Sequence, residues 1–190
     1  MGARNTSDGF GWVTRLAHWS LAISMLFLGW LGGAVVDLSY YDPLYNKALS
    51  LHDALGTLVG VVGLALVVWS LTNVRPTYPP GMSVWARTAA RSAHVVLYGF
   101  ILVLPITGYL PPTASGDGVD LFGLVEIPAL FKVTEGARDW VIQIHWYLAY
   151  GLPMLVLVHA LAAAKHQWIE RDGTLARMVF GHTGHGGSDS

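Results

Sequence analysis

Apolar residues along this chain gather in four long runs, separated by polar connections that contain glycine and proline. The runs cover about residues 12–36, 49–71, 89–110 and 140–164. A helix of roughly 20 apolar residues spans the hydrocarbon core of a bilayer, and every run reaches that length. The pattern therefore predicts an all-α fold: a four-transmembrane-helix bundle in one domain over residues 1–180, with a flexible tail at 181–190.

The first run could instead be a cleaved signal peptide, since Arg4 and Arg15 precede its apolar stretch. Its apolar stretch is longer than the roughly 7–15 residues of a typical signal core. It also carries His18 near its start, which a disposable leader does not need. We therefore expect this run to remain as the first span. The longest connection, residues 111–139, is rich in Gly, Pro and Asp, and its apolar pieces are expected at the membrane surface.

Composition supports a membrane protein and excludes several cofactor classes. Hydrophobic residues make up 53% of the chain and charged residues only 12%, against about 25% charged in soluble domains. The expected surroundings are membrane lipid, and nothing indicates nucleic acid. There is no cysteine, which excludes disulfides, Fe–S clusters and the covalent attachment of c-type haem.

Charge is distributed unequally between the two sides of the predicted bundle. One side carries eight basic residues: Arg4, Arg15, Arg75, Arg87, Arg91, Lys165, Arg171 and Arg177. The other carries three basic and eight acidic residues, a net charge of −5: Lys47, Lys132 and Arg138 against Asp37, Asp42, Asp53, Asp117, Asp120, Glu126, Glu135 and Asp139. The positive-inside rule predicts that both termini are cytoplasmic and that the outer face is acidic.

Six of the eight histidines lie in or beside the apolar runs, where ionisable residues are rare and usually functional. They are His18, His52, His94, His145, His159 and His166, whereas His182 and His185 fall in the Gly-rich tail. His145 and His159 are 14 residues apart on one helix, a rise of roughly 21 Å on nearly the same face. His52 matches His145 in depth, while both His18 and His94 compete to match His159.

Paired imidazoles at two depths are typical of two stacked b-type haems, each held between facing helices. The cytoplasmic side offers cations for haem propionates: Arg15, Arg87, Arg91 and Lys165. Two readings remain open for His166, a functional residue or a solvated interfacial one, and three for His94: a ligand, a supporting residue or a quinone contact. A transition-metal transporter is a third interpretation, but no line of acidic residues crosses the predicted bilayer.

Several motifs, in order and across all four helices, resemble the bacterial cytochrome b561 family. They are RLAHW at 15–19, LHDALG at 51–56, HVVLY at 94–98, PITGY at 105–109, HALAAAKH at 159–166 and RDG at 171–173. The resemblance implies a multi-pass protein of the bacterial inner membrane that holds two haem b groups and exchanges electrons with ubiquinone. It implies His18 with His159 as the cytoplasmic-side ligands and His52 with His145 as the outer pair. His94, His166, Arg91 and Lys165 become candidates for supporting or quinone contacts.

One departure concerns the end of the second run, where relatives often carry arginines and this chain has Leu66, Trp69 and Ser70. Arg75 or Arg87 is expected to serve instead as the propionate or quinone partner.

Two functions follow from the resemblance. The chain is either a superoxide:ubiquinone oxidoreductase or a haem b electron-transfer subunit for a dehydrogenase, hydrogenase or exported redox partner. The acidic outer face opposes the anion superoxide and favours a basic partner protein. A homo-oligomer is compatible with either function.

Overall fold

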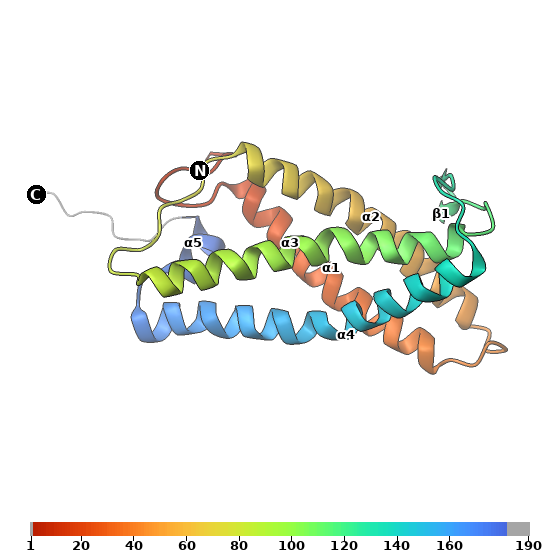
Figure 1. The fold of residues 1–190 in the computed structure, drawn as a ribbon. Coiled ribbons are helices and arrows are strands. Elements are labelled where there is room, and N and C mark those ends of the chain that lie inside the picture. Colours follow the sequence, from red (N-terminus) through yellow and green to blue (C-terminus); the bar gives the residue numbers. More distant parts are fainter. Residues whose placement is uncertain (1, 182–190) are drawn as a thin grey trace, which may run out of the picture.

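The fold is described here from a computed structural model, and the structure describes residues 2–181. The predicted tail, with His182 and His185, lies almost entirely outside the described residues. The elements, in chain order, are α1 (Trp12–Asp37), α2 (Tyr45–Thr72), α3 (Val84–Thr113), β1 (Val119–Leu121), β2 (Val125–Ile127), α4 (Glu135–Lys165), a π-helical turn (His166–Glu170) and α5 (Thr174–Phe180). Helices α1, α2, α3 and α4 run the length of the molecule (Figure 1).

The four long helices are long and apolar enough to cross a membrane, as the sequence predicts. Consecutive helices pack along one another, whereas α1 and α4 touch over a much shorter stretch. Large apolar side chains face outward along the bundle, among them Ile23 at 66% and Trp30 at 67% exposed. Such a surface is stable only when lipid covers it. The core that holds α1 against α2 contains Leu21, Leu28, Val59 and Leu66.

Helices α3 and α4 begin before their apolar runs because polar residues cap them. The Ser83 hydroxyl accepts a hydrogen bond from the Ala86 amide at 3.2 Å, and the Thr134 hydroxyl accepts one from the Ala137 amide at 3.4 Å. These caps start α3 and α4 about five residues before their apolar runs. At its other end α3 continues through Pro111 and Pro112 to Thr113, although each proline lacks the amide N–H that would bond to the carbonyl four residues earlier.

The all-α prediction needs one addition, because the connection between α3 and α4 contains a small β hairpin. Its strands β1 and β2 pair antiparallel, with Val119 opposite Ile127. The Asp120 carboxylate accepts from the Gly123 amide at 2.9 Å, closing the tight turn. The hydroxyl of Tyr109 donates to the Pro128 carbonyl and accepts from the Leu130 amide at 3.1 Å. These bonds fix the connection over one end of the bundle.

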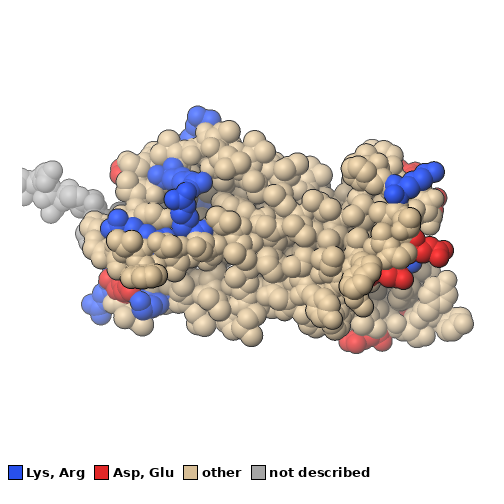
Figure 2. All heavy atoms as spheres, viewed as in Figure 1, with Lys and Arg blue, Asp and Glu red and all other residues tan. Residues whose placement is uncertain are grey.

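The opposite end is closed by both terminal segments. The Arg15 guanidinium donates to the Val179 carbonyl at 2.8 Å, and the Trp19 indole donates to the Met178 carbonyl at 3.1 Å. These contacts dock α5 on the start of α1. Figure 2 shows lysine and arginine gathered at this end, acidic side chains mostly at the hairpin end, and an uncharged band between them. We call the two ends the basic end and the acidic end.

Candidate functional site

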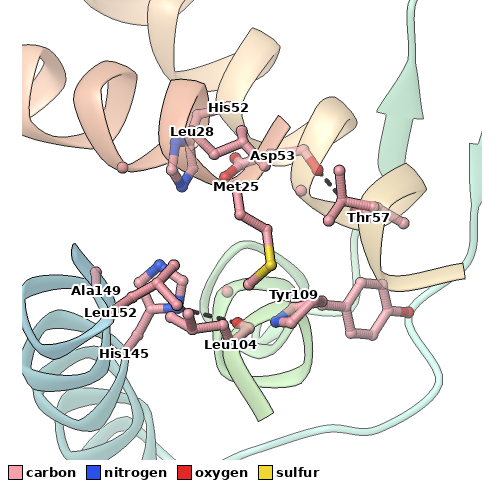
Figure 3. Close-up of a pocket in the computed structure, with 15 residues that line it drawn as sticks. Met25, Leu28, His52, Asp53, Thr57, Leu104, Tyr109, His145, Ala149 and Leu152 are labelled. Atoms are coloured by element: carbon pink, nitrogen blue, oxygen red, sulfur yellow. Dashed lines mark hydrogen bonds between the residues drawn. The ribbon is translucent and has the colours of Figure 1, made fainter. Parts of the chain in front are cut away.

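His52 on α2 and His145 on α4 face each other near the acidic end. Their ring centroids are 6.1 Å apart and their planes are nearly perpendicular, at 85°. Both side chains point into a pocket between the helices (Figure 3). The pocket is lined mainly by apolar and small residues: Met25, Leu28, Gly29, Asp53, Gly56, Thr57, Val59, Leu104, Pro105, Gly108, Tyr109, Ala149 and Leu152, besides the two histidines.

The separation of these two rings suits one metal ion between two imidazoles. With ring bonds of about 1.35 Å, each nitrogen lies about 1.15 Å from its ring centre. Rings 6.1 Å apart can therefore place two facing nitrogens about 3.8 Å apart. Two metal–imidazole bonds of about 2.0 Å each need almost the same span.

The hydrogen bonds of His145 leave one of its nitrogens available for such a bond. Its Nδ1 lies 3.1 Å from the Leu104 carbonyl oxygen and 3.1 Å from the Thr107 hydroxyl. A carbonyl oxygen can only accept, so Nδ1 carries the proton and donates it. The lone pair is then on Nε2, the arrangement in which metal-binding histidines are usually held.

Two glycines make room for the pair. A Cβ on Gly32 of α1 would lie 3.0 Å from Cε1 of His52, and a Cβ on Gly108 of α3 would lie 3.0 Å from Cε1 of His145. Those contacts are tighter than carbon atoms normally make. Each imidazole therefore rests against bare backbone of the neighbouring helix, and a larger residue at either glycine would displace it.

Three histidines meet nearer the basic end. The ring of His159 on α4 lies 6.3 Å from that of His18 on α1, with planes inclined at 55°. It lies 5.4 Å from the ring of His94 on α3, at 77°. The structure thus brings both sequence candidates to His159. The 6.3 Å separation leaves about 4.0 Å between facing nitrogens, again the span of two metal bonds of about 2.0 Å.

The remaining predicted residues have other contacts. The Nδ1 of His166 lies 2.6 Å from an Asp172 carboxylate oxygen and 2.7 Å from one of Glu170. Lys165 forms an ion pair with Glu170, and Arg91 is exposed. Partial burial alone would raise the pKa of Asp172, but the hydrogen bonds from Thr174 and His166 outweigh it and lower this pKa.

Sequence reasoning missed a contact at the end of α2. The Arg4 guanidinium lies 5.7 Å from the ring centroid of Trp69, in cation–π geometry. The Trp69 indole also donates to the Thr14 hydroxyl at 2.9 Å. An arginine from the N-terminal segment thus reaches Trp69, one of the positions that the sequence analysis singled out at the end of the second run. By contrast, the side chain of Arg87 donates to the Met82 carbonyl at 2.9 Å, in the connection before α3.

Comparisons with known proteins show which family the chain belongs to. Residues 9–181 match the family described as "Prokaryotic cytochrome b561". The chain is 35% identical over 180 residues to cytochrome b561 homolog 2 of Escherichia coli K12, covering 94% of this chain and 95% of that protein. It is 26% identical over 164 residues to the probable superoxide oxidase CybB of Yersinia pestis, covering 85% and 90%. A match over nearly the whole length, to a family that the four-helix fold and the histidines fit, identifies this chain as a multi-pass membrane protein of the prokaryotic cytochrome b561 family.

Proposed function

We propose that this protein carries electrons across the membrane, from a donor at the acidic end to ubiquinone in the bilayer. In this proposal His52 and His145 hold one haem b, and His18 and His159 hold a second. The observation that carries it is the pair of imidazole separations, 6.1 and 6.3 Å, in a member of a cytochrome b family. Haem b bound by these histidines would supply a one-electron redox centre.

The residues of the chain would hold the haem groups and keep water away from them. The bundle surrounds the acidic-end pair with apolar side chains such as Leu28, Leu104 and Leu152, which exclude water from the site. The Leu104 carbonyl fixes the proton of His145 on Nδ1. At the basic end Arg15 lies three residues before His18 on α1, so a cation is at hand for a propionate.

The distribution of charge supports an orientation for this transfer. The basic end carries the segment before α1, from residue 2, together with α5, and the positive-inside rule predicts that this end faces the cytoplasm. The His52–His145 pair then lies toward the outer face and the His18–His159 pair toward the cytoplasm. Electrons from an external donor would enter at the acidic end.

Superoxide is the first donor to test, since one relative of this chain is named a probable superoxide oxidase. The test is an anaerobic absorbance trace of the oxidised protein after a superoxide pulse. It is recorded with and without superoxide dismutase. Growth of a reduced b-type band that dismutase abolishes would establish superoxide as a donor. Intact haem that stays oxidised would exclude it.

Haem content tests the ligand assignment separately. We expect two haem b per chain in the purified protein, one in His52→Ala and one in His159→Ala. His166→Ala is the matched control, because its ring contacts Asp172 and Glu170, and it should retain both. Wild-type protein without haem would refute the proposal as a whole.

A second candidate function is electron transfer to or from a basic partner protein, and the acidic end favours it. Eight carboxylates against three cations repel a small anion but attract a protein of opposite charge. Among them, Asp117 lies beside the hairpin and Asp139 in the first turns of α4. In this function the hairpin connection is the docking surface.

A further inference from the structure

The role of His94 follows from its distance to His159, given the haem sites of the proposed function. If one nitrogen of each ring pointed at the other ring, rings 5.4 Å apart would leave about 3.1 Å between those two nitrogens. Two metal bonds of about 2.0 Å cannot fit into that gap. A single N–H···N hydrogen bond of about 2.9–3.1 Å can. The same measure gives about 4.0 Å for His18, so the geometry separates a ligand from a hydrogen-bond partner.

The protonation of His94 is fixed by its own helix. Its Nδ1 lies 2.7 Å from the Ala90 carbonyl oxygen, one turn earlier on α3. Because that oxygen can only accept, Nδ1 of the neutral ring carries the proton. The Nε2 of His94 is then an acceptor.

His159 needs such an acceptor if its Nε2 binds iron. A metal-bound histidine almost always donates its other N–H to a carbonyl, carboxylate or similar group. His145 has the Leu104 carbonyl for this purpose. Within residues 2–181, the polar side chains in ring contact with His159 are His18, the proposed opposite ligand, and His94.

We infer that His94 is a positioning residue whose Nε2 accepts the Nδ1–H of His159. This bond would orient the His159 ring and make it a stronger electron donor to the iron. A more basic axial ligand stabilises the oxidised state and lowers the reduction potential. The two haems would then differ, with a backbone carbonyl behind His145 and an imidazole behind His159.

Redox titration of the haem absorbance tests this role. His94→Leu should raise the midpoint potential of the basic-end haem and leave the other unchanged. His94→Gln, whose amide oxygen also accepts, should restore the lower value. Tyr98→Phe is a matched control one turn along α3, because it removes only a hydroxyl bonded to Ser70 and should change neither potential. His94→Ala repeats the test if the leucine variant does not fold.

Three results would overturn the inference. Unchanged potentials in His94→Leu with ubiquinone reduction intact would leave His94 no role at the haem, and unchanged potentials with ubiquinone reduction lost would assign it to the acceptor instead. Loss of the basic-end haem itself would make His94 an iron ligand. To identify the haem that responds, the titration is repeated in His52→Ala, where the proposed function leaves only the basic-end haem. Wild-type protein that carries fewer than two haem groups per chain would refute the proposed function, and this result is distinct from all three.

Discussion

Replacing Gly108 with alanine tests the paired-histidine site most sharply. The new Cβ would lie 3.0 Å from Cε1 and 3.4 Å from Nδ1 of His145. Carbon atoms prefer separations of about 3.5–4.0 Å, so the ring must move by roughly 0.5 Å or more. Metal–ligand distances tolerate only about 0.2 Å. The same movement strains the bond from Nδ1 to the Leu104 carbonyl, now 3.1 Å long.

We expect Gly108→Ala to weaken haem binding at the acidic end by about 10–100-fold, as when a ligand's supporting contact is lost. Folding should not suffer, because alanine favours a helix over glycine by about 1 kcal/mol. Haem per chain is measured after dilution with an apo-globin acceptor, and far-UV circular dichroism follows the helices. Gly99→Ala on the same helix is the control, since its Cβ would meet nothing within 4 Å. Equal haem retention in the two variants would refute the reasoning.

Three further predictions concern the two ends. Because folding lowers the pKa of Asp172, its contribution to α5 docking should be complete above its unfolded pKa of about 3.9 and vanish as pH falls through the lower folded value. Hydrogen exchange should show α5 amides losing protection over that range, and already unprotected at pH 7 in Asp172→Asn. Trp69→Phe leaves the Thr14 hydroxyl, now bonded at 2.9 Å, without its donor and should cost about 1 kcal/mol in thermal unfolding; an unchanged Tm contradicts this. Neutralising Asp117 and Asp139 should slow electron exchange with a basic partner at low salt, and a rate independent of salt and charge would exclude docking there.

The apolar pattern was enough to predict the helices, but not where they end. Length and hydropathy predict four spans because each span must cross the same thickness of hydrocarbon with apolar residues. The ends depend on caps such as Ser83 and Thr134, which lie outside the apolar runs. Helix α5 has only seven residues, too few to form alone. It depends on bonds from Arg15 and Trp19, distant in sequence.

The histidines, too, could be predicted only in part from the sequence. A spacing of 14 residues indicates that His145 and His159 share a face at two depths. Depth does not reveal which neighbouring helix faces them, so His18 and His94 could not be separated from periodicity alone. The structure adds ring separations of 6.3 Å for His18 and 5.4 Å for His94, and the proposed roles of the two residues rest on that difference. The contact of Gly32 with His52 and of Gly108 with His145 can be found only from the backbone geometry, because both glycines lie inside helices and neither marks a turn.

Helix α4 holds one histidine of each pair, and this affects how the protein is made. Chains are synthesised from the N-terminus at about 5–20 residues per second, so α1, α2 and α3 leave the ribosome first. Until α4 follows, His18 and His52 each lack the partner that faces them in the finished bundle. Both sites are completed within the 14 residues from His145 to His159. If these pairs hold the haem groups, as we propose, cofactor loading is a late event in biogenesis, and a nascent chain arrested before α4 would have neither site.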